Sequence, residues 1–313
     1  MKNAEIIAKL NLEQKCALLS GAGTFTTRGC PKAGVPSITL SDGPNGVRKQ
    51  AGAADHLGLN PSVPATCFPT AATVACSWDP ALGEQIGQAM GEEAAAQEVA
   101  VLLGPGLNTK RSPLCGRNFE YFSEDPYLSG KMAASYVRGI QSNGISACPK
   151  HFAVNSQELR RMASDSIVDE RTLRELYLTG FEIVVKEAAP KTIMSSYNLV
   201  NGVWNHYNYD LCTTVLRGEW GYDGSVMTDW WMQASEDPDF PALRDSAYRI
   251  RAQVDVLMPG SRPGDFPSPD EPDPAPLASC AAENGLTIAE LQRGARNVLG
   301  YILRSNALRN WKE

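Results

Sequence analysis

The 313-residue sequence predicts an α/β fold, a TIM-type (β/α)8 barrel whose first strands and helices can be irregular. Three observations support this fold class. Strand-like runs alternate with amphipathic helical patterns, the strand-like runs are almost continuously apolar, and no glycine-rich nucleotide-binding turn follows the first of them. The alternation is typical of a parallel sheet covered by helices, and the missing turn argues against an open nucleotide-binding sheet.

Six segments are predicted as strands because they are apolar or rich in β-branched residues. They cover residues 37–41, 99–103, 145–148, 192–196, 224–228 and 254–258. Two weaker candidates lie near residues 66–70 and near the N-terminus. This number of strands suits a closed barrel better than an open sheet, so we expect residues 1–313 to form a single barrel domain.

Helices are predicted between these strands because capping residues precede amphipathic stretches. The clearest starts are Asp79 before residues 81–98, Asp169 before residues 170–188, and the Thr287 capping box before residues 288–304. The segment 259–277 breaks the pattern, because its many prolines and acidic residues are incompatible with a helix interior or a central strand. We expect a surface loop there, on the face of the barrel where active sites form.

Composition and charge exclude several classes of function. The net charge is −6 without a dense run of Lys and Arg, so we expect no nucleic-acid partner and no membrane partner. There is neither a membrane-length apolar stretch nor a secretory signal, so we expect a cytoplasmic protein. Without a phosphate-binding glycine motif or a Cys/His cluster, we expect no cofactor and no metal.

Polar side chains directly follow four of the predicted strands. They are Asp42, the pair Lys150 and His151, Tyr197, and Asp229. The carboxyl ends of barrel strands converge at one mouth, so we expect these side chains to face a common space. Each residue alone has a simpler explanation as a strand-end carboxylate, a surface pair or a packed aromatic. Their occurrence together favours a site.

The expected site suits recognition of a sugar and attack on it. Asp229 is expected to act as a covalent nucleophile or a general base, kept ionised by Lys150 and a protonated His151. The ring of Trp230 offers an apolar face to a sugar. Schiff-base chemistry on Lys150 is an alternative in such a barrel, but it leaves the Asp229-Trp230 pair without a role.

Two arginines complete the candidate site. Arg48 ends a turn and is expected to fold back towards Asp42. Arg117 lies in a stretch that interleaves charged and aromatic residues, and is expected to bind a hydroxyl group or to brace a loop.

The same residues closely resemble glycoside hydrolase family 3, the family of β-glucosidases and β-xylosidases. The resemblance covers about residues 10–305. It rests on five motifs in the family's order, which are SDGPNGVR from 41, GRNFEYFSEDP from 116, PKHF from 149, MSSYN from 194 and MTDW from 227. Each motif is weak alone, but five in register are highly specific.

The resemblance implies a retaining hydrolase, most closely a β-glucosidase (EC 3.2.1.21), that releases terminal β-D-glucose or a similar sugar from a β-glucoside or oligosaccharide. It implies that Asp229 is the nucleophile and forms a covalent glycosyl-enzyme. The positions implied to bind substrate are Asp42, Arg48, Arg117, Lys150, His151, Met194, Tyr197 and Trp230.

A retaining mechanism also needs a second carboxyl group, about 5–5.5 Å from the nucleophile. In the family's β-glucosidases this acid/base is a Glu on a separate α/β sandwich domain, for which we expect no counterpart within residues 1–313. Single-domain relatives, the β-N-acetylglucosaminidases, use a His/Asp pair in the loop after the Lys-His-Phe motif. The corresponding loop here, residues 153–165, has no histidine.

Three alternatives follow. In the first, which we favour, the acid/base comes from a missing domain or from a partner chain, and we expect a sandwich-domain partner or a homo-oligomer. In the second, the chain itself uses Glu158 or Asp165. In the third, the chain is a non-catalytic sugar-binding or interaction protein that retains the pocket. Under the first alternative the lone chain hydrolyses only substrates with good leaving groups, and slowly.

Overall fold

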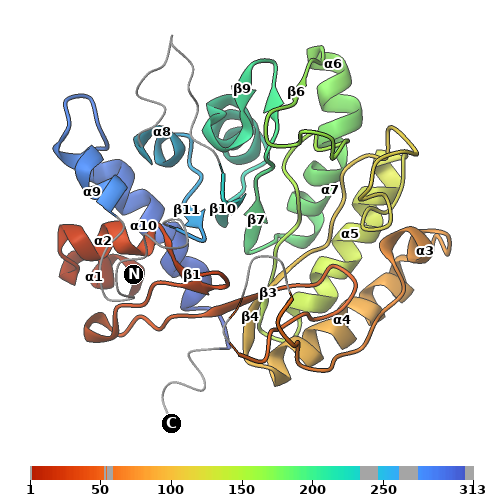
Figure 1. Ribbon diagram of the computed structural model, residues 1–313, viewed down its shortest axis with the longest axis horizontal. Helices are drawn as coiled ribbons and strands as arrows, with labels where there is room; N and C mark the ends of the chain where they lie inside the picture. The colour runs from red at the N-terminus through yellow and green to blue at the C-terminus, as the bar shows by residue number, and fades with distance from the viewer. Residues whose placement is uncertain (1, 53, 55–58, 233–245, 261–273, 307–313) are drawn as a thin grey trace.

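A computed structural model of the protein describes residues 2–52, 54, 59–232, 246–260 and 274–306. The central parallel strands lie in the interior, and helices lie around them (Figure 1). The strands are β1 (Gly21–Gly23), β2 (Thr26–Thr27), β3 (Thr39–Asp42), β4 (Val99–Leu103), β5 (Ser146–Ala147), β6 (Asp165–Ser166), β7 (Thr192–Met194), β8 (Leu199–Val200), β9 (Val203–Trp204), β10 (Ser225–Trp230) and β11 (Val256–Met258).

The helices differ widely in length and type. The α-helices are α1 (Lys2–Lys9), α2 (Leu12–Leu18), α3 (Ala71–Ala75), α4 (Pro80–Ala96), α5 (Pro126–Gln141), α6 (Glu170–Thr172), α7 (Thr179–Ala188), α8 (Ser246–Arg251), α9 (Pro274–Ala281) and α10 (Ile288–Ile302). The 3-10 helices are η1 (Pro31–Ala33) and η3 (Asn205–Tyr207), and the π-helical segments are η2 (Leu173–Leu178) and η4 (Asp210–Glu219).

Two groups of parallel strands form the centre of the fold. β3, β4 and β5 pair in parallel, and so do β7, β10 and β11. The chain after β5 joins the two groups, because Phe152 N–H donates to the carbonyl oxygen of Met194 at 2.8 Å. On the other side of the second group, Leu257 N–H donates to the carbonyl oxygen of Leu19 at 2.9 Å, directly before β1. An α/β fold with parallel strands is therefore confirmed.

The first strands depart from a regular barrel. β1 and β2 form an antiparallel pair, and β2 also runs antiparallel to β3. The sheets of the described residues therefore do not by themselves make the complete set of eight parallel strands that the sequence predicts. A smaller sheet of β6, β8 and β9 is separate from both central groups.

All six of the clearly predicted strands are present, but the weaker candidate at residues 66–70 is wrong. This segment is an irregular connection because its polar groups bond outside any ladder. Thr66 N–H donates to the carboxylate of Glu93, and the Thr70 side chain caps α3 by accepting a hydrogen bond from Thr73 N–H.

The predicted helix starts are confirmed, since the side chains of Asp79, Asp169 and Thr287 each accept a backbone hydrogen bond at the N-cap. In the predicted loop 259–277, residues 261–273 lie outside the described residues. The end of that segment is a helix instead of a loop, because α9 begins at Pro274. Prolines in a first helical turn lose no hydrogen bond, so they are compatible with this start.

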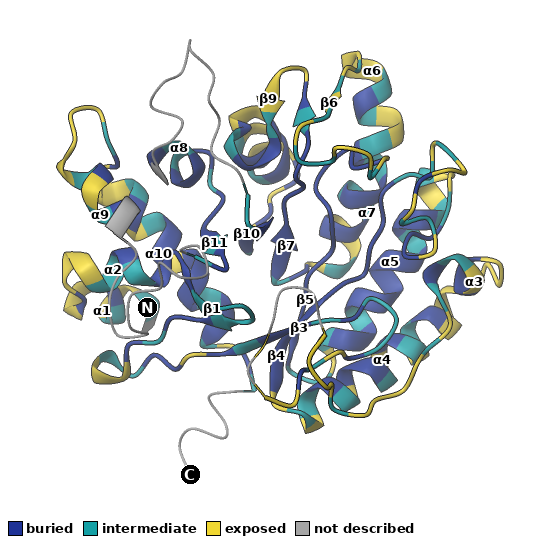
Figure 2. Ribbon diagram, viewed as in Figure 1, coloured by how far each residue is buried: buried dark blue, intermediate teal, exposed yellow. Residues whose placement is uncertain are grey.

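The core lies between the strands and the inner faces of the helices, where the ribbon in Figure 2 is almost entirely buried. Glycines bring α4 and α5 close together. A Cβ atom on Gly87 would lie 2.6 Å from the carbonyl oxygen of Tyr136, closer than such atoms approach in folded proteins. Among the described residues, no helix combines the length and the apolar character needed to cross a membrane.

The close contact between α4 and α5 predicts the effect of adding one methyl group. Gly87→Ala should lower the free energy of unfolding by about 1–3 kcal/mol, because the backbone of Tyr136 must move away. Gly218→Ala is a matched helical control, since its new Cβ would lie 3.5 Å from its nearest neighbour, the carbonyl oxygen of Thr213. Urea unfolding of both variants measures the difference, and equal stability of the two would contradict the tight contact.

Candidate active site

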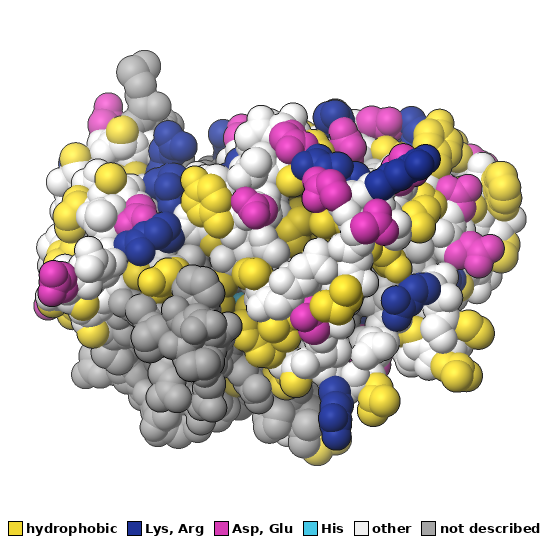
Figure 3. Space-filling model, turned by 90° about the horizontal axis from the view of Figure 1, so that it is seen from above, with side chains coloured by type: hydrophobic (Ala, Val, Ile, Leu, Met, Phe, Trp, Pro, Cys, Tyr) yellow, Lys and Arg dark blue, Asp and Glu magenta, His cyan; other side chains and the backbone are white. Residues whose placement is uncertain are grey.

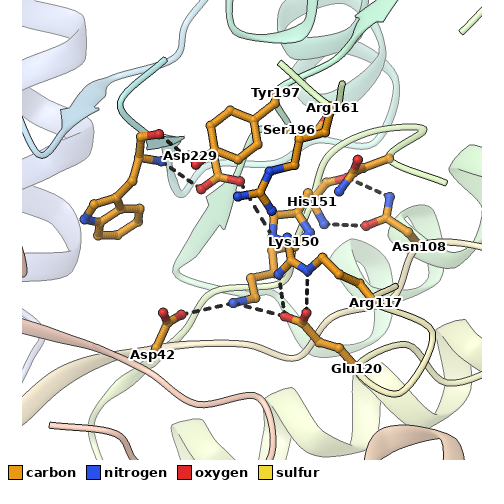
Figure 4. Close-up of polar contacts among 12 residues, drawn as sticks. Asp42, Asn108, Arg117, Glu120, Lys150, His151, Arg161, Ser196, Tyr197 and Asp229 are labelled. Atoms are coloured by element: carbon orange, nitrogen blue, oxygen red, sulfur yellow. Dashed lines mark hydrogen bonds and ion pairs between the residues drawn. The ribbon is translucent and has the colours of Figure 1, made fainter. Parts of the chain in front are cut away.

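The predicted strand-end residues lie together at one site. Asp42 ends β3, Lys150 and His151 follow β5, Tyr197 follows β7, and Asp229 lies near the end of β10. Their side chains turn towards a common space, although they come from distant parts of the sequence (Figure 4). The predicted convergence of the strand ends is therefore present in the structure.

Asp229 is a buried carboxylate with one unsatisfied oxygen. Its Oδ1 accepts a hydrogen bond from Trp230 N–H at 2.7 Å, whereas its Oδ2 has no hydrogen-bond partner among the described residues. Nε2 of His151 lies 3.7 Å from Oδ2, too far for a hydrogen bond. Burial raises the pKa of Asp229 to about 6, and the charges of Arg117, Lys150 and Arg161 only partly oppose this rise.

Four charged side chains form a chain of ion pairs beside Asp229. Lys150 Nζ lies 3.2 Å from Oδ1 of Asp42 and 3.2 Å from Oε1 of Glu120. Arg117 contacts the same Glu120 carboxylate with two nitrogens, at 2.6 and 2.8 Å. Burial alone would raise the pKa of Glu120, but Lys150 and Arg117 outweigh burial and hold this pKa below its usual value.

Lys150 is an ammonium ion in this setting. Burial disfavours its charge, but Asp42 and Glu120 outweigh burial and raise the pKa of Lys150 above its usual value. A Schiff base requires the free amine, so the arrangement argues against that chemistry on Lys150.

His151 is neutral, so the expectation of a protonated imidazole is wrong. Burial lowers the pKa of His151 well below its usual value, and the charges of Arg117 and Lys150 lower it further. One ring nitrogen has a neutral neighbour, since Nδ1 lies 3.1 Å from the hydroxyl of Tyr121. Asn108 holds the backbone of His151 with two hydrogen bonds, at 2.7 and 2.8 Å.

Arg161 reaches the site from the loop that follows the Lys-His-Phe motif. Its guanidinium carbon lies 4.7 Å from the centre of the Tyr197 ring, and its NH1 lies 2.8 Å from Oε2 of Glu158. The Tyr197 hydroxyl donates to the carbonyl oxygen of Trp230 at 2.7 Å. Burial raises the pKa of Tyr197, so its hydroxyl keeps its proton.

Trp230 forms a wall of the site together with the β1–β2 hairpin. Its Nε1–H donates to the carbonyl oxygen of Thr24 at 2.5 Å, and its ring centre lies 5.6 Å from that of Phe25. Met194 is buried in the same apolar cluster as Trp230. These contacts fix the indole ring next to Asp229.

The remaining predicted residues lie at varying depth. Arg48 is exposed, and its backbone N–H donates to the carbonyl oxygen of Asp42 at 2.9 Å, so the chain folds back as expected. Glu158 is half-buried and paired with Arg161, as described above. Asp165 is exposed in β6, where it pairs with Leu199 of β8.

A hollow of about 410 Å³ opens beside Lys150. It is lined by Asp42 and the turn that follows it, by residues 65–67, and by Arg117, Phe119 and Glu120. The size is at the lower end of the range for small-molecule sites. No three His, Cys, Asp or Glu side chains within the described part of the chain are placed to hold a metal ion.

Sequence reasoning missed several residues that shape the site. Glu120 and Tyr121 lie inside the motif that starts at residue 116. The motif indicates that this segment belongs to the site, but it does not predict the contacts of these two side chains. Asn108, Asn155 and Arg161 carry no local signal, because their roles depend on which loops meet at the strand ends.

Comparison with known proteins gives consistent matches. Residues 53–265 match the glycosyl hydrolase family 3 N terminal domain. Thermostable beta-glucosidase B of Acetivibrio thermocellus is 51% identical over 257 residues, which are 82% of this chain and 33% of that protein. An exo-alpha-(1->6)-L-arabinopyranosidase of Bifidobacterium longum is 42% identical over 302 residues, which are 96% of this chain and 37% of that protein.

A solved structure matches equally well. Beta-glucosidase 3B from Thermotoga neapolitana, solved in complex with glucose, superposes with a TM-score of 0.88 at 37% identity. The superposition covers 100% of this chain and 44% of that one, so the chain spans less than half the length of these relatives. These matches place the chain among the glycoside hydrolases. It belongs to glycosyl hydrolase family 3, of which it matches the N-terminal domain.

The raised pKa of Asp229 predicts that its charge opposes folding. The pKa is about 6 in the folded chain and about 3.9 in an unfolded one. The folded state holds the proton more tightly, so the free energy of unfolding falls as the pH rises from about 4 to about 6 and stays lower above that range. Asp229→Asn should therefore raise the free energy of unfolding at pH 7.5 by on the order of 3 kcal/mol.

The same variant should change stability little at about pH 4, where the Asp229 carboxyl is protonated in the folded state. Urea unfolding of both proteins at the two pH values makes the comparison. An equal gain at both values would contradict a raised pKa for Asp229.

Proposed function

We propose that the chain carries the nucleophile and the sugar subsite of a retaining glycoside hydrolase that releases β-D-glucose or a similar β-linked sugar. The main support is the arrangement around Asp229, whose buried, unpartnered Oδ2 lies 3.7 Å from Nε2 of His151 and feels the charges of three cations. Membership of family 3 gives independent support.

In the proposed reaction, Oδ2 of Asp229 attacks the anomeric carbon and forms an ester bond to the sugar. The bond to the leaving-group oxygen breaks, and that oxygen takes up a proton from a general acid. Water then attacks the same carbon and gives its proton to the deprotonated acid, which now acts as the base, so that the ester bond breaks, the free carboxylate returns and the sugar is released. The attacking group must be ionised, and a pKa of about 6 leaves it so at neutral pH.

We propose that hydrogen bonds and one aromatic face hold the sugar. Asp42 is suited to accept from hydroxyl groups, and Lys150 and Arg117 are suited to donate to them. His151 and Tyr197 border the nucleophile, and Trp230 stands beside it. Arg48 and Met194 complete the set that the family resemblance implies, and Arg161 joins it because of its position over the Tyr197 ring.

The acid/base is proposed to come from outside residues 1–313, either from a further part of a longer protein or from a partner chain. The carboxylates described near Asp229 are already committed to cations. Asp42 and Glu120 pair with Lys150, and Glu158 pairs with Arg161 and accepts from Asn155. The chain also spans only about a third of the length of its relatives, which leaves room in them for a contributing domain.

The finer features of the fold also stay proposals. We propose that the two parallel strand groups belong to one TIM-type barrel, supported by the bonds from Phe152 to Met194 and from Leu257 to Leu19. The single-domain organisation, the cytoplasmic location and a homo-oligomer or sandwich-domain partner stay predictions from the sequence.

The nucleophile assignment predicts a simple loss of function. Asp229→Ala should lower kcat for an aryl β-D-glucoside by about four orders of magnitude or more, as loss of a covalent nucleophile typically does. Asp210→Asn, at an exposed carboxylate in η4, is the control and should retain full activity. Circular dichroism would check that both variants are folded. Retained activity in the Asp229 variant would remove the nucleophile assignment.

If the acid lies outside residues 1–313, the rate of hydrolysis by the lone chain should depend strongly on the leaving group. The lone chain should hydrolyse 2,4-dinitrophenyl β-D-glucoside, whose leaving group needs no proton, at least about 100-fold faster than cellobiose. Aryl β-D-xyloside and aryl α-L-arabinopyranoside, tested in parallel, would show which sugar the subsite prefers.

Efficient hydrolysis of cellobiose by the lone chain would contradict an external acid. Glu158→Gln and Asp165→Asn would then show which loop carboxylate supplies the proton. If neither substrate is hydrolysed while glucose still binds, the chain is instead a sugar-binding protein that retains the pocket.

A further inference from the structure

Both nitrogens of the buried His151 ring face oxygen atoms of known identity. Nδ1 lies 3.1 Å from the Tyr121 hydroxyl, and Nε2 lies 3.7 Å from Oδ2 of Asp229. The two ends of the ring therefore connect a buried tyrosine to the proposed nucleophile (Figure 4). A neutral imidazole carries one hydrogen, so only one of these nitrogens can be a donor.

The contacts continue from His151 through Tyr121 and Asn155 to Glu158. Glu158 determines which group donates in each of these hydrogen bonds. Nδ2 of Asn155 lies 3.4 Å from Oε1 of Glu158 and 3.3 Å from the Tyr121 hydroxyl. A carboxylate only accepts, so it orients the amide of Asn155 with its NH2 group towards Glu158. The same NH2 group then donates to the oxygen of Tyr121.

Tyr121 is left with one hydrogen to give. Its oxygen accepts from Asn155, and among the described residues Nδ1 of His151 is the acceptor within reach of its O–H. The hydroxyl therefore donates to Nδ1, which must be the bare nitrogen. The hydrogen of the imidazole then lies on Nε2, the nitrogen that faces Asp229.

From this geometry we propose that Tyr121 is a positioning residue: it fixes His151 as the tautomer with hydrogen on Nε2, and Glu158 sets the direction through Asn155. This role rests on the proposed function of Asp229 as the nucleophile. Nε2–H presents a positive dipole to the unpartnered oxygen of the carboxylate. The other tautomer would place a lone pair opposite the same oxygen, and the two electron-rich atoms would repel each other.

Other contacts hold the ring in place but do not choose the tautomer. Asn108 fixes the backbone of His151 with two hydrogen bonds, which do not involve the imidazole. Arg117, Lys150 and Arg161 act on the net charge of the ring and favour its neutral form. Among the residues that the structure describes, the Tyr121 hydroxyl is the group that contacts Nδ1, on the side of the ring away from Asp229.

The assignment also gives the loop that follows the Lys-His-Phe motif a defined role. Glu158 divides its carboxylate between Arg161 at 2.8 Å and Asn155 at 3.4 Å. One oxygen thereby holds the guanidinium over Tyr197, and the other orients the path to His151. Glu158 acts here through its neighbours, without donating a proton to the substrate.

The test compares Tyr121→Phe with Tyr136→Phe. Tyr136 is a matched control, because it is also buried and its hydroxyl has no hydrogen-bond partner among the described residues. Nitrogen-15 NMR of the imidazole rings reports the tautomer directly, and the chain contains only 3 histidines to assign. Glu158→Gln is a second variant. It replaces the carboxylate that orients the Asn155 amide, and Glu158 is only half-buried.

In the unmodified chain we expect hydrogen on Nε2 of His151. Tyr121→Phe should give a mixture of tautomers and lower kcat for 2,4-dinitrophenyl β-D-glucoside by about 10- to 100-fold, as the loss of such an outer partner does for metal-bound histidines. KM should change by less than about threefold, and Glu158→Gln should shift the tautomer in the same direction. Tyr136→Phe should leave tautomer and rate unchanged.

Hydrogen on Nδ1 in the unmodified chain would overturn the proposal, and so would an unchanged tautomer in Tyr121→Phe. If the tautomer behaves as expected while no variant, including the unmodified chain, hydrolyses the glucoside, the proposed function fails and the role of Tyr121 in fixing the tautomer stands. The NMR result thus separates the two failures.

Discussion

The site depends on keeping a charge in a place from which water is largely excluded. Asp229 as a residue is 7% exposed, and only one of its carboxylate oxygens accepts a hydrogen bond from the described residues. Taking a carboxylate out of water without full replacement of its hydrogen bonds is unfavourable, which is why its pKa rises. The neighbouring cations limit this cost. The carboxylates and loops around the site hold those cations in position.

Each cation near Asp229 also forms an ion pair with a carboxylate other than Asp229. Lys150 lies between Asp42 and Glu120, Arg117 is held by Glu120 through two nitrogens, and Arg161 by Glu158. Acidic and basic side chains are likewise interspersed over the outer face seen in Figure 3. A carboxylate that fixes a cation is poorly suited to deliver a proton. The same pairs therefore support the proposal that the acid comes from outside residues 1–313.

Much of this could be predicted from the sequence, because the signals are local. The strands at 99–103 and 192–196 are apolar runs, the helix starts have capping residues, and a polar residue directly after a strand must lie at the end of the sheet. The antiparallel start at β1 and β2 could not be predicted, since short glycine- and threonine-rich segments carry no clear period. Apolar burial also decided the charge of His151, and burial depends on the whole fold.

Residues on long connections were the hardest to foresee for a related reason. Arg161 and Asn155 have no neighbours in the sequence that reveal their partners, and their roles arise only when the loop closes over the strand ends. Glu120 illustrates the intermediate case. It lies within a recognisable motif, but its pairing with Lys150 joins a turn to the segment after β5, and neither segment alone reveals this partner.

The hydrogen bond from the Trp230 indole to Thr24 joins residues that are 206 positions apart. During synthesis on the ribosome, the β1–β2 hairpin cannot form this contact until Trp230 has been made. Chains dominated by such distant pairings order slowly, because a long loop must close first. The wall that Trp230 forms thus takes shape later than the hairpin beside it, and a nascent chain that has not reached residue 230 leaves Phe25 without its aromatic neighbour.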